Sequence, residues 1–383
     1  MNSVELDSGS APAGAAQNDF NSEDERFMRL ALALGRRGLG NTWPNPAVGA
    51  VVVKDGVVLG RGWTQPGGRP HAETEALRRA KRSARGATLY VTLEPCSHDG
   101  QTPPCADAVI QAGIKRVVCA LEDPNPQVAG QGYAKLRASG IQVDTGLLAD
   151  EARRAHAGHI AKITQARPHV LLKMALSSDE KVGFAGNKRA FITGDDAQAR
   201  VHMMRAKSDA VLTGIGTVLA DNPQLTCRLP GMFERSPIRV VLDANLRTPL
   251  SLGVISTVRE TPTWVFCATG ASEMAEEILV HKGAKVFRVP ETNGKLDLGE
   301  VLKTLAAEGI TRLMVEAGPR VAASFVGDGL VDEVALLRAP KPLGEGSLEA
   351  LDGMALSALT EGMSEGETEE VGEDTLTWYE KAQ

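Results

Sequence analysis

His71, Glu73, Cys96 and Cys105 are the residues whose types and spacing indicate the clearest chemistry in this 383-residue chain. One histidine and two cysteines offer the nitrogen and sulfur ligands that zinc prefers, and they leave a fourth tetrahedral position for water. Zinc lowers the pKa of such a water toward neutrality and so makes hydroxide available. Glu73 follows the histidine by two residues. It is not needed as a ligand, so we expect it to move a proton from the water to a leaving nitrogen.

The order of these residues is that of the His-x-Glu and Pro-Cys signature of zinc nucleobase deaminases. Here, however, eight residues, Ser97 to Pro104, separate the two cysteines, where the signature has two. A loop can bulge out between two ligands and return, so the insertion is compatible with the site. It argues against a plain cytidine or tRNA-adenosine deaminase. The alternative is a closed structural zinc site with His98 as the fourth ligand, which would leave Glu73 without a purpose.

The composition is that of an ordinary globular protein, with 43% hydrophobic residues, 23% charged residues and a formal net charge of −6. No basic face is evident, so we expect no nucleic-acid partner, and the absence of a run of about 18 apolar residues predicts no membrane span. Cys119, Cys227 and Cys267 lie in apolar segments and are expected to be buried free thiols, which suits a reducing cytoplasm. Residues 1–20 are rich in small and polar residues and predict a disordered tail.

The first half of the chain alternates predicted helices and strands, which indicates an α/β layered domain. Ser22 is the expected N-cap of the first helix. His71 and Cys105 both fall at the start of a predicted helix, where the helix dipole stabilises thiolates. The expected helices cover 22–37, 71–82 and 149–165 together with one from about residue 104, and the expected strands cover 47–53, 57–60, 87–93 and 114–120.

The second half, after Pro168, also predicts an α/β fold. Just before it, His156 and His159 lie three apart on a predicted helix, but no third ligand accompanies them, so we expect both to be exposed to solvent. The tail 361–374 is acidic, and 375–379 is expected to be a last edge strand. The other expected strands are 170–175, 210–213, 238–242, 263–267, 284–289, 312–315 and 333–337, and the expected helices are 195–205, 273–281, 298–308 and 320–327.

Two glycine-containing turns, 213–217 and 315–320, each follow a predicted strand and precede a helix. Glycines in such a position let a phosphate approach backbone N–H groups. One turn alone is weak evidence, but two in one domain favour a dinucleotide or phosphate site. Arg205 and Arg228 are candidates for a phosphate clamp, because guanidinium groups bind phosphate bidentately.

The chain also resembles one family closely, the bifunctional pyrimidine deaminase/reductase of riboflavin biosynthesis. The resemblance rests on 43–49, 71–73, 92–98, 102–105 and 123–126 with Gly130 and Gly132, and in the second half on 212–223 and 315–319. It implies a cytidine-deaminase-like α/β/α domain at 21–166 and a dihydrofolate-reductase-like α/β domain at 167–383. The implied reactions are zinc-dependent hydrolytic deamination of 2,5-diamino-6-(5-phosphoribosylamino)pyrimidin-4(3H)-one and then NADPH-dependent reduction of the ribosyl group. A homodimer through the reductase domain is implied as well.

The resemblance also implies roles for individual residues. His71, Cys96 and Cys105 would hold Zn²⁺, and Glu73 would be catalytic. Asn45 and His98 would bind the deaminase substrate. The residues implied to bind NADPH are Ala175, Phe191, Thr217, Asp221, Ala244, Gly318, Pro319 and Arg320. The residues implied to bind the reductase substrate are Arg189, Arg205, Leu225, Arg228 and Glu316.

Departures from the family pattern are concentrated in the reductase half. Glu180 stands where the family has glycine, Arg189 and Phe191 replace a serine and a tryptophan, and Ala244 replaces a serine. In the deaminase half, Gln101 replaces a basic residue. Two alternatives follow, namely a deaminase whose reductase-like domain has lost activity and, more remotely, a zinc-stabilised interaction protein without catalysis.

Overall fold

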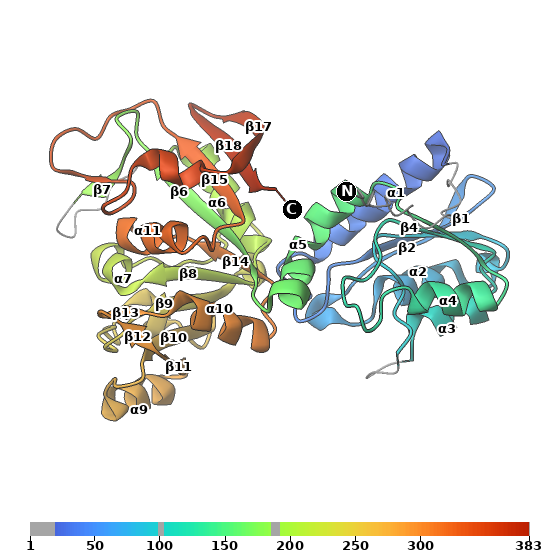
Figure 1. Ribbon diagram of the computed structural model, residues 1–383, viewed down its shortest axis with the longest axis horizontal. Helices are drawn as coiled ribbons and strands as arrows, with labels where there is room; N and C mark the ends of the chain where they lie inside the picture. The colour runs from blue at the N-terminus through green and yellow to red at the C-terminus, as the bar shows by residue number, and fades with distance from the viewer. Residues whose placement is uncertain (1–19, 99–102, 185–191, 383) are drawn as a thin grey trace, which may run out of the picture.

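The computed structural model describes residues 20–98, 103–184 and 192–382, and it consists of two halves side by side, each built on its own sheet (Figure 1). The expected tail 1–20 falls almost wholly outside the described residues, as do Arg189, Phe191 and Gln101. Within the described part, no helix is both long enough and apolar enough to cross a membrane.

The first half is a five-stranded sheet between two layers of helices. Alternate residues of strand β1 point to opposite faces, so Ala50 and Val52 pack under one helical layer and Val51 and Val53 under the other. The strand order is β2-β1-β3-β4-β5, with β1 antiparallel to both neighbours and β3, β4 and β5 parallel. The strands are β1 Gly49–Lys54, β2 Val57–Trp63, β3 Thr88–Val91, β4 Arg116–Cys119 and β5 Gln142–Thr145. Helices α2 Ala72–Ala80, α3 Cys105–Gln111 and α4 Gln131–Ala138 cover one face, and α1 Ser22–Gly35 and α5 Ala149–Gln165 the other.

The N-cap of helix α1 lies one residue earlier than the sequence predicted. Asn21, not Ser22, is the N-cap, and its side chain accepts a hydrogen bond from the Asp24 N–H while Asp24 caps back onto Asn21. This reciprocal arrangement satisfies two otherwise unpaired N–H groups. Short 3-10 helices at Arg36–Gly38, Pro66–Gly68 and Lys81–Ala84 complete the first half.

The second half is a nine-stranded sheet in the order β11-β10-β9-β8-β14-β6-β15-β18-β17. Seven of these strands run parallel, and β18 and β17 join antiparallel to their neighbours at one edge. The strands are β6 His169–Leu176, β8 Ala210–Gly214, β9 Ile238–Leu242, β10 Thr263–Ala268, β11 Lys285–Val289, β14 Arg312–Val315, β15 Glu333–Arg338, β17 Met363–Val371 and β18 Asp374–Lys381. Small two-stranded pairs join β12 Glu291–Thr292 to β13 Lys295–Leu296, and β7 Lys181–Phe184 to β16 Ser347–Glu349.

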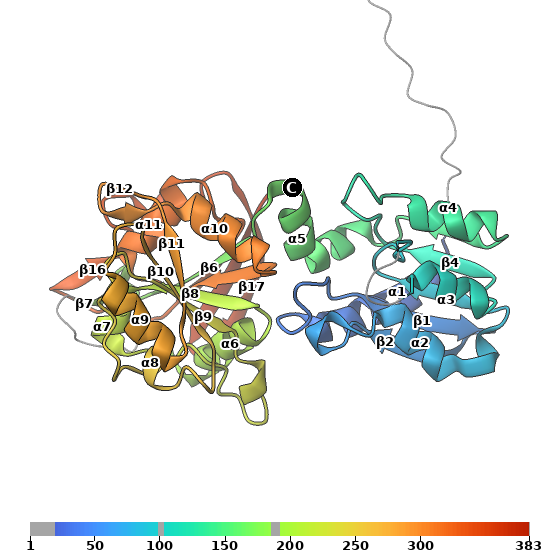
Figure 2. The same cartoon turned by 90° about the horizontal axis from the view of Figure 1, so that it is seen from below.

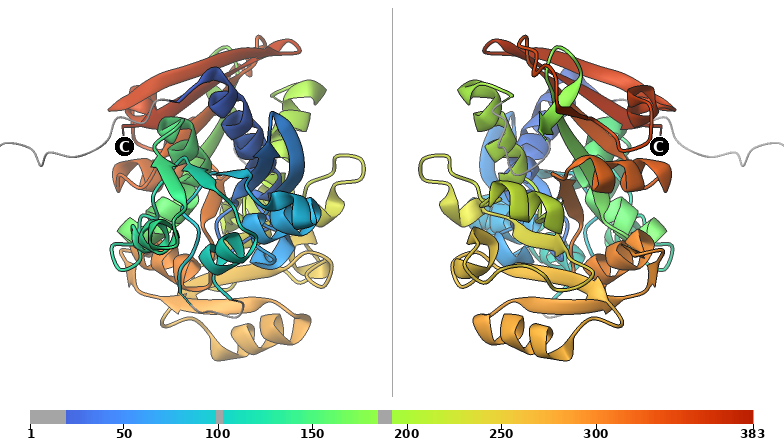
Figure 3. Two further views of the ribbon diagram at one scale, coloured as in Figure 1. Left: turned by 90° about the vertical axis from the view of Figure 1, so that its right-hand side faces the viewer. Right: turned by 90° about the vertical axis from the view of Figure 1, so that its left-hand side faces the viewer.

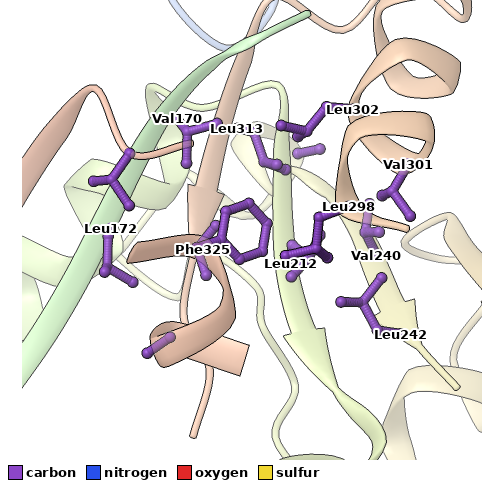
Figure 4. Packing of buried hydrophobic residues seen from close by; sticks show 14 of the residues in the cluster. Val170, Leu172, Leu212, Val240, Leu242, Leu298, Val301, Leu302, Leu313 and Phe325 are labelled. Atoms are coloured by element: carbon purple, nitrogen blue, oxygen red, sulfur yellow. The ribbon is translucent and has the colours of Figure 1, made fainter. Parts of the chain in front are cut away.

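Two helical layers cover this larger sheet as well. One contains α10 Leu298–Ala307 and α11 Pro319–Gly327, and the other contains α6 Asp195–Ala206, α7 Ile215–Asp221, α8 Gly253–Ser256 and α9 Glu273–Lys282. Short 3-10 helices lie at Phe233–Arg235 and Leu356–Thr360. In Figure 4, Phe325 of α11 and Leu302 of α10 pack onto Leu172, Leu212 and Leu313 of the strands below. Their short apolar runs made these strands predictable from the sequence.

The C-terminal edge differs from the prediction. The acidic stretch was not expected to be a strand, yet Met363–Val371 forms β17 at the sheet edge, and the expected edge strand is the second from that edge. The strand escaped detection because its side chains are nearly all exposed and therefore polar on both faces. Charged side chains on an edge strand discourage pairing with other chains.

Candidate active sites

Three potential metal ligands converge at one end of the first sheet. His71 is the N-cap of α2, Cys105 is the first residue of α3, and Cys96 lies in the loop after β3. Their ligand atoms all lie within 4.8 Å of one another, with His71 Nδ1 3.2 Å from Cys105 Sγ and 3.7 Å from Cys96 Sγ. One imidazole nitrogen and two sulfurs match the donor set of a catalytic zinc site, so the residues present fit the metal.

The arrangement does not include His98. The His98 side chain is exposed, and the cluster that the described residues form has three members. A three-ligand set leaves one tetrahedral position for water, as a hydrolytic site requires. The geometry therefore disfavours the closed structural site that the sequence left open.

The electrostatics at this cluster favour a thiolate. Contacts with Cys105 and His71 lower the pKa of Cys96 to about 4, and the Cys105 backbone N–H also donates to Cys96 Sγ at 3.3 Å. A thiolate is the form of cysteine that binds metal.

Glu73 lies in the first turn of α2 beside the ligands and is 3% exposed. Burial raises the pKa of its carboxyl to about 7, although His71 acts in the opposite direction. The helix can approach this closely because it rests on glycines of β2. A Cβ on Gly62 would lie 2.1 Å from the Ala72 carbonyl oxygen, which real side chains do not tolerate. The sheet thus fixes how deeply Glu73 enters the site.

Glu94 is a residue of this site that the sequence reasoning did not assign. Its carboxylate accepts N–H groups from Asp123, Gly130 and Gly132 at 3.2, 3.0 and 2.8 Å, across a loop far along the chain. Cys96 follows two residues later, so this carboxylate anchors the segment that presents the thiolate. The signal available in the sequence was an acid placed directly before Pro95-Cys96 with a glycine-containing loop to receive it.

Asn45 lies in the rigid segment after α1, half-buried against the turn that leads to His71. Its side-chain amide donates to the Gly68 carbonyl oxygen at 3.0 Å, and Thr42 Oγ1 donates to the Asn45 carbonyl oxygen at 3.1 Å. The structure therefore places this predicted substrate-binding residue beside the zinc-ligand segment.

The prediction that His156 and His159 face solvent was wrong. His156 is 2% exposed and burial lowers its pKa to about 3, while its Nε2 lies 3.1 Å from Thr92 Oγ1. The His159 side chain is 13% exposed, with Nε2 3.8 Å from an Asp123 carboxylate oxygen. The reason is that α5 lies between the two halves of the molecule, as Figure 2 shows, so the side that carries the two histidines is covered, while Arg153, Arg154 and Ile163 remain exposed. The sequence alone does not show that the second half of the molecule covers this side of α5.

The two glycine turns of the second half meet at the carboxyl edge of its sheet. Strands β8 and β14 are parallel neighbours, so the turns that follow them lie side by side. The Gly318 N–H donates to Thr217 Oγ1 at 3.2 Å and so joins them. Ligands of open α/β sheets bind in this position, beyond the carboxyl ends of the strands.

This edge offers features that fit a dinucleotide. The Thr213 hydroxyl is buried and has no hydrogen-bond partner in the described part of the chain, and a Cβ on Gly216 would meet nothing within 4 Å. A ligand at the turn would supply the partner that the hydroxyl lacks. Of the other predicted cofactor residues, Asp221 ends α7, Pro319 opens α11, and Ala175 and Ala244 lie at or just after the ends of β6 and β9. Arg320 faces outward, with a side chain 90% exposed and 3.3 Å from Asp352.

Arg205 and Glu316, two of the predicted substrate-binding residues, form a largely buried ion pair. Its guanidinium binds the Glu316 carboxylate through two bonds of 2.6 and 2.9 Å and also donates to the Thr226 carbonyl oxygen. Burial raises the pKa of Glu316, but Arg205 outweighs this effect and lowers it to about 2. The Arg205 guanidinium thus already holds a carboxylate in this structure, and its role in binding the substrate phosphate stays a prediction.

Lys173 on β6 is a charged residue near this pair that the sequence reasoning missed. Burial lowers the pKa of its ammonium, and Glu316 partly offsets that effect. A lysine within an apolar strand was the available signal.

Among the remaining predicted substrate residues, Leu225 is 2% exposed with its side chain in the core, so its backbone alone can meet a ligand, whereas Arg228 is exposed.

Comparison with known proteins agrees with this division of the chain. Residues 21–121 match the model of the cytidine and deoxycytidylate deaminase zinc-binding region, and residues 168–377 match the RibD C-terminal domain. The chain is 41% identical to the riboflavin biosynthesis protein RibD of Aquifex aeolicus, over 94% of this chain and 98% of that protein. It is 42% identical to the Escherichia coli protein of the same name, over 84% of this chain and 89% of that protein.

Solved structures show the same similarity over nearly the whole molecule. Acinetobacter baumannii RibD superposes with a TM-score of 0.84 at 34% identity, covering 94% of this chain and 99% of that one. A Thermotoga maritima deaminase/reductase gives 0.82 at 35% identity, with the same coverage. Both predicted fold types are thereby confirmed. The chain belongs to the RibD family of riboflavin biosynthesis proteins, which join a zinc-dependent deaminase to an NADPH-dependent reductase.

Proposed function

We propose that this chain catalyses two successive steps on one phosphoribosylaminopyrimidine. The first is hydrolytic deamination of 2,5-diamino-6-(5-phosphoribosylamino)pyrimidin-4(3H)-one, and the second is reduction of the ribosyl group of the product to ribityl. The Thermotoga maritima relative is a diaminohydroxyphosphoribosylaminopyrimidine deaminase/5-amino-6-(5-phosphoribosylamino)uracil reductase. The observation that carries the proposal is the convergence of His71, Cys96 and Cys105 with Glu73 beside them.

In the first step, water adds to C2 of the pyrimidine and the exocyclic C–N bond breaks. Ammonia departs, and a carbonyl remains at C2. Zinc held by His71, Cys96 and Cys105 supplies an acidified water. Glu73 accepts the proton of that water and delivers it to the departing nitrogen, a role for which burial prepares its carboxyl. Asn45 and His98 hold the pyrimidine and its substituents.

For the second step, the two glycine turns would hold NADPH, which would supply the hydride that reduces the ribosyl group. Thr217, Asp221 and the turn at Gly318 position the cofactor. Glu316, held by Arg205, faces the substrate together with Arg228 and Lys173. These groups orient the phosphorylated sugar. As hydride adds to the anomeric carbon, the bond from that carbon to the ring oxygen breaks, and the oxygen takes a proton.

The assembly and location of the chain are part of the same proposal. We assign the deaminase domain to 21–166 and the reductase domain to 167–383, since α5 ends at Gln165 and β6 begins at His169. A homodimer through the reductase domain and a cytoplasmic location complete the assignment. The unpaired state of Cys119, Cys227 and Cys267 supports a reducing compartment.

The substitution Glu73→Gln tests the deaminase mechanism. It should reduce ammonia release by about 10²-fold or more, because a neutral amide cannot move the proton, and it should leave zinc bound. Glu75→Gln, on the same helix but paired with Arg78, serves as the matched control and should retain activity. Full activity of the Glu73→Gln protein would refute the assignment.

A further inference from the structure

The Asn45 loop, residues 41–47, lies where the two halves of the molecule meet. On its inner side it contacts the segment that leads to His71. The Gly67 N–H donates to the Asn41 carbonyl oxygen at 2.9 Å, and Gly68 packs so closely on Asn45 that a Cβ there would come within 2.2 Å of its amide nitrogen. Any movement of this loop therefore moves Asn45 relative to the zinc ligands.

The reductase half holds the outer side of the same loop. Trp43 belongs to the deaminase sequence, yet its side chain packs against the core cluster of the larger sheet. Gly309, in the turn before β14, lies under the Trp43-Pro44 pair, and a Cβ on Gly309 would come 2.9 Å from Pro44 Cβ. A side chain in that position would push the loop away, so glycine keeps the contact close.

Arg235, in the second half, fastens the chain just before the loop. Its guanidinium donates to the carbonyl oxygens of Arg37 at 3.1 Å and of Leu39, and also to that of Ala206 in its own half at 3.2 Å. Gly40 continues this contact, since a Cβ there would lie 2.6 Å from the Ala206 carbonyl oxygen. One side chain thus ties the backbone of the two halves together.

We infer that the reductase half positions the Asn45 loop of the deaminase half. The positioning elements are Arg235 and the residues of the reductase half that pack on Trp43. Asn45 is then held from both sides, by the zinc-ligand segment within its own domain and by the second domain from outside. This inference rests on the proposed function and adds a structural reason for joining the two activities in one chain. The loop that carries Asn45 is thus supported by residues of both halves.

The test uses Arg235→Ala and Arg235→Lys in the full-length, zinc-loaded chain, with Trp43→Ala as an independent perturbation of the same loop. Arg259→Ala, an exposed arginine elsewhere in the reductase half, is the matched control. Deaminase KM and kcat, reduction of separately supplied deaminated substrate, zinc content and amide hydrogen exchange over residues 38–49 are measured for each variant.

Arg235→Ala and Trp43→Ala should raise the deaminase KM about tenfold, because a misplaced binding loop weakens substrate alignment. Amide exchange over 38–49 should accelerate, while zinc content and the reductase kinetics stay at wild-type values. Arg235→Lys should recover part of the loss, since an ammonium can reach one of the carbonyls, and Arg259→Ala should change nothing.

A wild-type deaminase KM and wild-type exchange in both Arg235→Ala and Trp43→Ala would overturn the inference. So would an equal loss of both activities together with zinc, which would signal general unfolding. Failure of the proposed function looks different. The wild-type chain would then release no ammonia, while amide exchange over 38–49 would still report whether Arg235 and Trp43 hold the Asn45 loop.

Discussion

Glu94 illustrates how one buried carboxylate can organise a metal site without touching the metal. It collects backbone N–H groups from the loop at 123–133 and lies two residues before Cys96. Glu94→Gln would turn an amide N–H₂ toward those donors. We expect a loss of about 2–3 kcal/mol in the free energy of unfolding, because charged hydrogen bonds are replaced by unsatisfied donors. Zinc content should fall as well.

Urea unfolding and zinc analysis of the purified variant check this prediction. Glu122→Gln, an exposed acid in the neighbouring loop, is the control and should leave both quantities unchanged. A Glu94→Gln protein with wild-type stability and full zinc would show that the segment is anchored by other contacts.

His156 makes stability depend on pH in a direction that burial dictates. Its folded pKa of about 3 lies below the unfolded value of 6.5. The unfolded state therefore binds the proton more readily, so the stability that this residue contributes is complete above pH 6.5 and is lost as pH falls toward 3. Near pH 5, this single group should cost about 1.4 kcal/mol per pH unit.

His156→Gln removes that titration and keeps a hydrogen-bonding partner for Thr92. The difference in free energy of unfolding between wild type and variant should therefore shrink between pH 7 and pH 5. Chemical unfolding at several pH values measures it, and a difference that stays constant would contradict the burial argument.

At the scale of elements, the turn between β6 and β7 contains a residue in an unfavourable conformation. Glu180, which stands where the family has glycine, has φ +60°, in the left-handed region. Its one ion pair, to Arg338 at 3.8 Å, is exposed and therefore weak. Glu180→Gly should stabilise the protein by about 1 kcal/mol relative to Glu180→Ala, since only glycine adopts that conformation without steric cost. Thermal and urea unfolding of the pair decide the matter, and equal stability would argue against strain at this turn.

Elements with a strong apolar alternation were predictable from the sequence, and those defined by distant partners were not. The buried strands of the larger sheet either alternate or are mostly apolar, so their positions were predicted to within a residue or two. Strand β17 carries polar residues on both faces and was missed. The buried state of His156 depends on a second domain, and the Arg205–Glu316 pair joins residues that lie 111 positions apart, so neither was evident from local pattern.

The ligand positions of the first half were readable for a different reason. His71, Glu73, Cys96 and Cys105 lie close together in two short stretches, and local chemistry limits what such a combination does. The role of Glu94 was not predicted, because its hydrogen-bond partners lie about 30 to 40 residues later. The sequence spacing does not show that this later segment folds back onto Glu94. Lys173 escaped because a single charged residue in a strand is ambiguous without its neighbours.

In the whole molecule, the glycine turns of the second half lie at the edge of its sheet that is away from the first half. Contacts with the first half involve residues at or just before the amino ends of β14 and β8, such as Gly309 and Ala206. The glycine turns lie at the opposite, carboxyl edge, so the length of the strands, roughly 17–26 Å for five to eight residues, separates them from the interface. Helices α7 and α11 accordingly lie on the side away from the first half in Figure 1, the end that faces the viewer in the right-hand view of Figure 3.

This arrangement predicts that the deaminated intermediate leaves the first site before it is reduced. A mixture of Glu73→Gln chains and reductase-deficient Lys173→Met chains should therefore reach the overall steady-state rate of an equal concentration of wild-type sites, after a lag. Following NADPH oxidation from the diaminopyrimidine substrate tests this. A mixture that remains several-fold slower than wild type, when each variant retains its own full partial activity, would indicate direct transfer within one chain.

One chain should carry out both reactions, and this claim can be tested by following both in one cuvette. Zinc-loaded protein, 2,5-diamino-6-(5-phosphoribosylamino)pyrimidin-4(3H)-one and NADPH are combined, and ammonia release and NADPH oxidation are recorded together. We expect one NADPH to be consumed for each ammonia released, with ammonia appearing first. Ammonia without loss of NADPH would contradict the claim for the reductase half, and no ammonia at all would contradict it for the site at His71, Cys96 and Cys105.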